Sequence, residues 1–275
     1  MKLLELKREL YQQFGQAKID KQEVDILLCE VLNIKLEELY KLEQVDKQTV
    51  QKVKKFAKKR LSGMPIQKIF NRAYFFDNVF FVNNNVLCPR PETELLAEEV
   101  IKIANSKTKV LDLCTGSGCI AITIQKNTSA KVVASDVSKK ALYVARKNAK
   151  NLNSDVQFVC SDMFKNIKGK FDIIVSNPPY IPTKTCQTLD KEVKDFDPII
   201  SLDGGKDGLD FYRIICQNAK QYLDKNGKIL LEVGIKQATK VENMLKAAGF
   251  DTKIKKDYNN IERIVIGENN DWKMR

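Results

Sequence analysis

Apolar residues in the first part of the chain recur at intervals of three and four positions. Two such sets are Leu3, Leu6, Leu10 and Phe14, and Leu27, Leu28, Val31 and Leu32. This spacing places each set on one face of an α-helix, and such faces are buried against neighbouring helices. We therefore expect a small helical bundle over residues 1–75.

The helical spacing breaks at residues 63–65, between Gly63 and Pro65. Residues 74–87 are then rich in aromatic residues and Val around polar turns, which is typical of a short hairpin. We place a β-hairpin linker at residues 76–90 and a larger domain at residues 91–275. Pro91 suits the first turn of a helix, with the acidic Glu92 and Glu94 near its positive end.

Strand-like apolar runs then alternate with helix-like segments. The runs span 110–113, 132–135, 156–160, 171–175, 229–233, 252–255 and 263–266; the helix-like segments span 119–126, 138–150, 209–223 and 236–248. This alternation predicts an α/β fold with a mostly parallel, doubly wound sheet. Residues 257–262 are too few for a parallel crossover, so we expect the last two strands to be antiparallel neighbours.

Composition bounds the class of protein. A chain of 275 residues that is 43% hydrophobic can bury a sizeable core. Its formal net charge of +12 is densest in residues 1–75, and the run 52–60 holds six cations. Apolar residues at helical spacing within that run favour a solvated basic face. The alternative is a basic face that approaches ribosomal RNA or a negatively charged protein partner.

The chain has no histidine and seven scattered cysteines. The missing histidine excludes His-based acid–base chemistry, Ser-His and Cys-His nucleophiles and His-containing zinc sites, and we expect no metal site. An odd number of cysteines without a CxxC pair favours reduced thiols. Acidic residues interrupt the first ten positions and no apolar span approaches about 18 residues, so we expect a cytoplasmic protein without membrane contact.

Glycine and acidic residues gather where the strand-like runs end. Gly116, Gly118 and Ala121 fit the GxGxxA pattern of dinucleotide loops, and Asp136 follows Gly116 by 20 residues, the offset of a ribose-binding acid. Asp162 follows the third run; it could be a surface turn residue, but its place at the carboxyl end of the strand favours a contact with adenine. These residues alone leave an NAD-dependent oxidoreductase as an alternative.

The segment Asn177-Pro178-Pro179-Tyr180 ends the fourth run and points to a different chemistry. An amide nitrogen is a poor nucleophile because its lone pair is delocalised, so it needs orientation more than deprotonation. The prolines stiffen the turn, and the side-chain carbonyl of Asn177 and the backbone carbonyl of Pro178 can accept the N–H bonds of a substrate NH2 group. Tyr180 would pack over that planar group.

These motifs resemble those of the bacterial release factor glutamine methyltransferases, the HemK family of S-adenosylmethionine-dependent enzymes. The resemblance covers nearly the whole chain and depends on the segments 89–94 (PRPETE), 114–118, 177–180, 196–198, 203–209 and 231–234. It implies a Rossmann-like seven-stranded methyltransferase sheet, parallel with one antiparallel strand, plus a small all-α N-terminal domain that binds the release factor.

The resemblance also implies a reaction and its residues. A methyl group would pass from S-adenosyl-L-methionine, leaving S-adenosyl-L-homocysteine, to the side-chain amide of the glutamine in the Gly-Gly-Gln motif of peptide chain release factors. Asn177, Pro178 and Tyr180 would be the catalytic residues. By position, the methionine moiety of the cofactor would lie on Cys114, Thr115, Gly116, Ser117 and Gly118. The ribose would lie on Asp136 and the adenine on Asp162 and Met163. The substrate amide would lie on Asn177, Pro178, Pro179 and Tyr180, with Asn177 also beside the cofactor.

Two positions depart from the family pattern. Cys114 stands where many such enzymes have the first glycine of the loop, and Asp197 stands where a Glu often precedes the proline. The long, acid-leaning connection over residues 183–207 favours a protein substrate over phosphates. The alternatives are an amino methyltransferase acting on adenine in DNA or guanine in ribosomal RNA, and a non-enzymatic RNA-binding protein. Direct binding of nucleic acid is less favoured than binding of a release factor.

Overall fold

The computed structural model describes residues 1–269, which form two compact units. The first unit comprises residues 1–71 and the segment 191–196. The second comprises residues 72–190 and, among the described residues, 197–269, so the hairpin belongs to it. Within residues 1–269, no helix is long and apolar enough to cross a bilayer.

The first unit is a helical bundle, as the periodicity of its apolar residues predicted. Its helices are α1 (Leu3–Gln16), α2 (Gln22–Leu32), α3 (Leu36–Leu39), α4 (Lys47–Leu61), α5 (Ile66–Phe70) and, from the later segment, α10 (Lys191–Lys194). The apolar faces of α1, α2 and α4 meet in one core that includes Leu6, Leu27 and Val53.

Helix α4 carries the basic run. Its N-cap, Asp46, accepts hydrogen bonds from the backbone N–H groups at 48 and 49, which satisfies donors left open at a helix start. The five lysines of the run are exposed, as expected of a solvated face. Arg60 instead is buried and forms ion pairs with Glu23 (2.5 Å) and Glu192 (2.7 Å). The ion pair with Glu192 joins α10 to the bundle.

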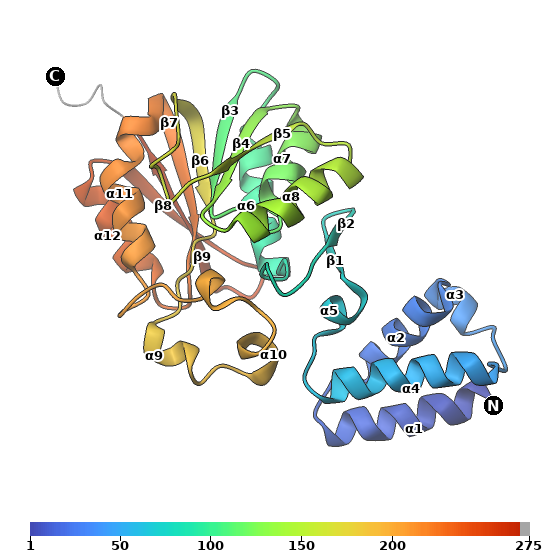
Figure 1. The fold of residues 1–275 in the computed structure, drawn as a ribbon. Helices are drawn as coiled ribbons and strands as arrows, with labels where there is room; N and C mark the ends of the chain where they lie inside the picture. Colours follow the sequence, from blue (N-terminus) through green and yellow to red (C-terminus); the bar gives the residue numbers. More distant parts are fainter. Residues whose placement is uncertain (270–275) are drawn as a thin grey trace. The chain divides into compact units, whose positions relative to one another are not determined.

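The second unit contains a hairpin and a seven-stranded sheet (Figure 1). The hairpin pairs β1 (Arg72–Phe75) with β2 (Asn78–Phe81). The sheet has the order β5-β4-β3-β6-β7-β9-β8. Its strands are β3 (Lys109–Leu113), β4 (Lys131–Asp136), β5 (Val156–Cys160), β6 (Phe171–Ser176), β7 (Leu223–Glu232), β8 (Asp251–Lys256) and β9 (Glu262–Glu268).

The direction of the strands confirms the predicted fold. Strands β5, β4, β3, β6 and β7 run parallel, whereas β9 is antiparallel to both β7 and β8. The last two strands are therefore antiparallel neighbours, as the short connection between them required. The antiparallel strand lies between β7 and β8 rather than at the edge of the sheet.

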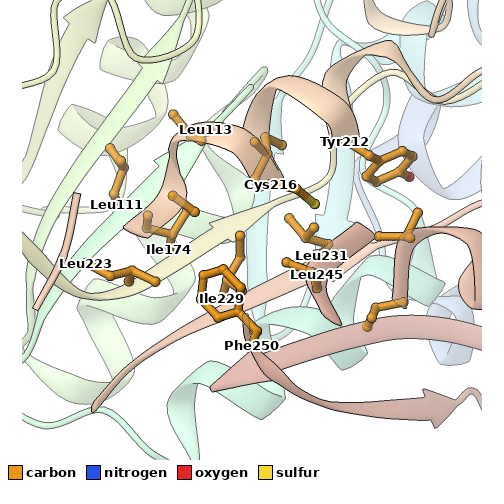
Figure 2. Packing of buried hydrophobic residues seen from close by; sticks show 14 of the residues in the cluster. Leu111, Leu113, Ile174, Tyr212, Cys216, Leu223, Ile229, Leu231, Leu245 and Phe250 are labelled. Atoms are coloured by element: carbon orange, nitrogen blue, oxygen red, sulfur yellow. The ribbon is translucent and has the colours of Figure 1, made fainter. Parts of the chain in front are cut away.

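Helices cover both faces of this sheet (Figure 1). On one face lie α6 (Pro91–Ile101), α7 (Cys119–Thr128) and α8 (Lys139–Asn151); on the other lie α11 (Asp210–Tyr222) and α12 (Ala238–Ala247). Successive strand residues point to opposite faces. Thus Ile174 packs with Tyr212 and Leu245 in the α11/α12 core (Figure 2), and Ile173 packs in the α6/α7 core.

The parallel register brings the strand ends to one edge. Leu113 of β3 lies opposite both Ser135 of β4 and Ser176 of β6, and Ser176 lies opposite Leu231 of β7. The segments that follow β3, β4, β6 and β7 consequently emerge side by side. Ligands of doubly wound sheets bind beyond this carboxyl edge.

Candidate functional site

A cavity opens at the carboxyl edge of the sheet, within the second unit. Seven of the residues predicted for the site line it: Cys114, Gly116, Asp136, Asp162, Met163, Asn177 and Pro179. Five others lie outside its lining: Thr115, Ser117, Gly118, Pro178 and Tyr180. Because the parallel strands end at one edge of the sheet, most of the predicted site residues lie together.

The glycine loop after β3 divides into a lining part and a supporting part. A Cβ built on Gly116, whose φ is +56°, would meet no atom within 4 Å, so this backbone is open to a ligand. Gly118 has φ +82°, and a Cβ there would lie 3.2 Å from Ala145 of α8. This glycine lets α7 and α8 pack closely.

Thr115 and Ser117 hold the loop through hydrogen bonds to neighbouring side chains. The hydroxyl of Thr115 donates to the buried carboxylate of Asp112 at 2.6 Å. The backbone carbonyl of Ser117 accepts a hydrogen bond from the side chain of Asn148 at 2.9 Å. Burial raises the pKa of Asp112 to about 7.

Cys114 takes a backbone conformation that favours glycine. Its φ is +60°, in the left-handed region, which costs a non-glycine residue on the order of 1 kcal/mol. Burial raises the pKa of its thiol far above the ordinary value, so the thiol stays neutral. Its Sγ lies 3.9 Å from the Sδ of Met163, and the two sulfurs give the cavity an apolar, polarisable wall.

Asp136 is fixed by two backbone donors. Its Oδ2 accepts from the N–H of Gly116 at 2.9 Å and its Oδ1 from the N–H of Ser138 at 2.8 Å. Burial raises its pKa, and these two hydrogen bonds oppose that shift. A carboxylate has about four lone-pair sites, so both oxygens can still accept hydrogen bonds from a vicinal diol in the cavity.

The wall beyond Asp136 includes residues that sequence reasoning missed. Val137 is 49% exposed and lines the cavity, as do Ile200 and Phe211. The sequence offered one signal for Val137, an apolar residue directly after Asp136, the acid expected to bind ribose. Phe164, which follows Met163 in the chain, does not line the cavity and stacks on Tyr222 with ring centroids 4.7 Å apart.

The hairpin side also contributes. Residues 85–87, which were expected to serve only as part of a linker, line the cavity. No pattern in the sequence places this turn beside the glycine loop, because the packing of Val86 near α8 is a tertiary contact.

Asn177 lies at the centre of the carboxyl edge. Its Nδ2 donates to the Oγ1 of Thr93 in the first turn of α6, at 3.2 Å. Glu232, the last residue of β7, lies next to both side chains and is buried. Burial raises the pKa of Glu232 to about 7.

Tyr180 is not part of the lining and packs against the α11/α12 core. Its backbone carbonyl accepts a hydrogen bond from Gln237 Nε2 at 2.9 Å, and the same nitrogen donates to the carbonyl of Gly208 at 3.3 Å. A Cβ on Gly208 would lie 2.3 Å from the Tyr180 oxygen, and a Cβ on Gly204 would lie 2.7 Å from the Tyr180 Cα. The segment 204–208 therefore packs directly on the Asn-Pro-Pro-Tyr turn.

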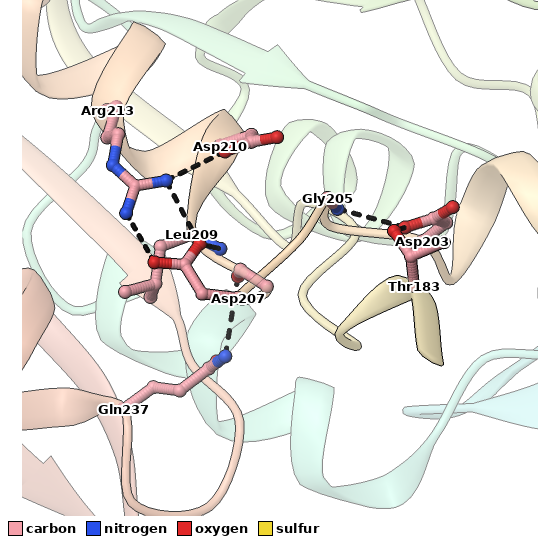
Figure 3. A network of polar contacts seen from close by, with 9 residues as sticks. Thr183, Asp203, Gly205, Asp207, Leu209, Asp210, Arg213 and Gln237 are labelled. Carbon is pink, nitrogen blue, oxygen red and sulfur yellow. Dashed lines mark hydrogen bonds and ion pairs between the residues drawn. The ribbon is translucent and has the colours of Figure 1, made fainter. Parts of the chain in front are cut away.

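A polar network holds that segment in place (Figure 3). Asp203 accepts hydrogen bonds from the hydroxyl of Thr183 at 2.7 Å and from the N–H of Gly205 at 2.9 Å. The guanidinium of Arg213 donates to both carboxylate oxygens of Asp207. These bonds give a long connection a defined backbone.

Asp197, the second departure from the family pattern, forms an ion pair with Arg90 at 3.3 Å and does not line the cavity. Three of the next four residues, Pro198, Ile200 and Ser201, line the cavity. The ion pair thus joins the segment before α6 to this part of the cavity wall.

Comparisons with known proteins agree with the family resemblance. Residues 5–70 match a family model described as the PrmC N-terminal domain, and residues 91–196 match the methyltransferase small domain. The release factor glutamine methyltransferase of Thermodesulfovibrio yellowstonii is 38% identical and covers 97% of this chain and 98% of its own length. That of Chlorobaculum tepidum is 36% identical, covering 91% of each chain.

A solved structure supports the fold. The crystal structure of a methyltransferase from Pyrococcus furiosus superposes with a TM-score of 0.57 at 20% identity, covering 78% of this chain and 97% of that one. This likeness confirms the expected methyltransferase sheet.

Proposed function

The chain belongs to the release factor glutamine methyltransferase family, and we propose that it methylates the side-chain amide nitrogen of the glutamine in the Gly-Gly-Gln motif of peptide chain release factors. The observation that supports this most strongly is the place of Asn177. Its amide lines the same cavity as Gly116 and Asp136. One cavity thus combines an amide-binding group with residues suited to a nucleoside.

The residues of the cavity fit S-adenosylmethionine, which when bound supplies a methyl group on a positively charged sulfur. The open backbone of Gly116, in the loop from Cys114 to Gly118, would accommodate the methionine moiety. Asp136 would accept hydrogen bonds from the ribose hydroxyls. Asp162, Met163 and Val137 would flank the adenine.

Asn177 would orient the nucleophile. Its side-chain oxygen and the backbone oxygen of Pro178 would accept the two N–H bonds of the glutamine amide. This holds the nitrogen lone pair toward the methyl carbon. Positioning of this kind can lower a barrier by about 7–11 kcal/mol in the best cases.

The bonds balance without an acid catalyst. The amide nitrogen forms a bond to the methyl carbon as the carbon–sulfur bond breaks, and the bonding pair leaves with the sulfur as a neutral thioether. The nitrogen then loses one proton to solvent. The absence of histidine from the chain is compatible with this route, because no step needs a general acid.

The helical unit would bind the body of the release factor. Its exposed lysines on α4 form a basic face, which suits an acidic patch on a protein partner.

Two substitutions test the assignment of the site. Asn177→Ala should leave S-adenosylmethionine binding within about twofold and lower kcat by at least about 100-fold, since positioned contacts of this kind contribute that much. Asp136→Asn should instead weaken cofactor binding about tenfold or more, because it exchanges an acceptor for a donor. Titration calorimetry and single-turnover transfer separate the two effects. Asn218→Ala on α11, outside the cavity, is the matched control, and turnover by Asn177→Ala at the control's rate would contradict the assignment.

A further inference from the structure

Three distant segments bring Thr93, Asn177 and Glu232 together. Thr93 lies in the first turn of α6, Asn177 directly after β6, and Glu232 at the end of β7. The register pairs Ser176 with Leu231, so the two residues that follow these emerge beside each other. Thr93 and Glu232 are 3% and 4% exposed, so neither is a surface residue whose contacts are incidental.

One hydrogen bond and one buried carboxylate define this group of side chains. Asn177 Nδ2 donates to Thr93 Oγ1 at 3.2 Å. Both side chains also lie close enough to the Glu232 carboxylate to lower its pKa, against the larger effect of burial. Among the residues that the structure describes, the Oε2 of Glu232 is buried without a hydrogen-bond partner. Burial of a carboxylate beside the reactive turn calls for an explanation beyond packing.

Donor and acceptor rules fix the direction of each bond. An ionised carboxylate only accepts, so an interaction between it and Thr93 favours the hydroxyl proton pointing to Glu232. The oxygen of that hydroxyl can then accept from Asn177, and only the NH2 end of the Asn177 amide can donate. The NH2 end of Asn177 is therefore directed to Thr93, and its Oδ1 is left for the cavity.

We propose that Thr93 and Glu232 are positioning residues for methyl transfer: together they lock the Asn177 amide with Oδ1 toward the substrate. This inference rests on the proposed function, in which Oδ1 accepts an N–H of the glutamine amide. A flipped Asn177 would present NH2 to NH2, two donors without an acceptor. The lock thus selects the one orientation that can hold the substrate.

A pair of near-isosteric substitutions isolates the hydroxyl. Thr93→Val keeps the shape of the side chain and removes the hydroxyl; Thr93→Ser keeps the hydroxyl. Loss of one such hydrogen bond lowers kcat about tenfold in Thr93→Val, whereas Thr93→Ser stays within about threefold of wild type. Binding of S-adenosylmethionine, measured by calorimetry, stays unchanged in both, which a general disturbance of the fold would not allow.

The pH profile gives a second readout. When Glu232 is protonated it can donate, and the direction of the bonds is no longer fixed. Wild-type kcat therefore falls as the pH drops below about 7, the value to which burial raises the pKa of Glu232, and this acid limb disappears in Glu232→Gln. The other titratable groups that face Glu232 are Arg263 on β9, Glu92 on α6, Tyr180, Tyr212 and Cys119. The pKa values of Tyr180, Tyr212 and Cys119 are raised, so these groups do not titrate near pH 7.

A substrate-free measurement separates this inference from the proposed function. The side-chain NH2 protons of Asn177, followed by NMR on labelled full-length protein, exchange slowly with water in wild type and Thr93→Ser and rapidly in Thr93→Val. If wild type transfers no methyl group to a release factor, the proposed function fails. The exchange pattern would still show whether Thr93 holds the orientation of the Asn177 amide. Wild-type kcat in Thr93→Val, or equal exchange in all three proteins, overturns the inference.

Discussion

Gly208→Ala tests whether the segment 204–208 positions the Asn-Pro-Pro-Tyr turn. Gly208 has φ +76°, and its added Cβ would lie 2.3 Å from the carbonyl oxygen of Tyr180 and 2.8 Å from Gln237 Nε2. Gly169 has φ +86° and nothing within 4 Å of its added Cβ. Gly169→Ala is therefore a matched control that carries the backbone strain without the collision.

The two substitutions differ by a calculable amount. Left-handed backbone costs an alanine roughly 1–2 kcal/mol in either variant. The collision at Gly208 adds about 1–3 kcal/mol, the usual cost of overpacking. Urea unfolding should therefore show a loss of stability in Gly208→Ala that exceeds that in Gly169→Ala by at least about 1 kcal/mol.

The same collision acts on turnover. The Tyr180 carbonyl must retreat by about 1 Å to reach ordinary contact, and a misplacement of this size can cost about 100-fold in rate. The prolines transmit the shift, since they stiffen the turn that carries Asn177. Methyl transfer to a release factor should fall by that order in Gly208→Ala and stay near wild type in Gly169→Ala. Equal stability and equal turnover in the two variants would refute the packing argument.

Two further predictions concern charge. Burial raises the pKa of Asp112 to about 7 from its ordinary 3.8. The folded state therefore binds the proton of this carboxyl more tightly than the unfolded chain does. The contribution of Asp112 to stability consequently rises as the pH falls from 7 to 4. The free energy of unfolding of wild type, measured relative to Asp112→Asn, should be larger at pH 5 than at pH 8, and the opposite trend would contradict the burial of this carboxyl. Replacing the exposed Lys55 and Lys58 by Glu should raise the KM for the release factor about tenfold at low salt, with cofactor affinity unchanged; an unaltered KM would remove α4 from the binding surface.

Much of the fold could be predicted because its strands are continuous apolar runs. The runs at 110–113, 171–175 and 263–266 became β3, β6 and β9 with shifts of one or two residues at their ends. The short connection before β9 fixed its direction, but its place between β7 and β8 depends on pairing across the sheet, which no local pattern encodes.

The residues that follow a strand were easier to predict than those that support them. Asp136 and Asn177 could be placed in one cavity because parallel strands end at one edge. Thr93 and Glu232 were beyond reach, since their contact with Asn177 joins segments separated by 84 and 55 positions. The junction of α10 with the helical unit likewise depends on the long-range ion pair between Arg60 and Glu192.

Cys114 shows a third kind of limit. Its sequence position suggested a glycine-like role, but whether the backbone would turn left-handed could not be read from a cysteine. The observed φ of +60° shows that the surrounding loop determines the conformation.

The central claim is tested most directly by transfer of a labelled methyl group from S-adenosylmethionine to a purified release factor. The assay should include a factor whose Gly-Gly-Gln glutamine is replaced, together with DNA and ribosomal RNA. We predict label on the intact factor alone, located by mass spectrometry on the amide of that glutamine. Label on the replaced factor or on nucleic acid, or no transfer to any of them, would contradict the account.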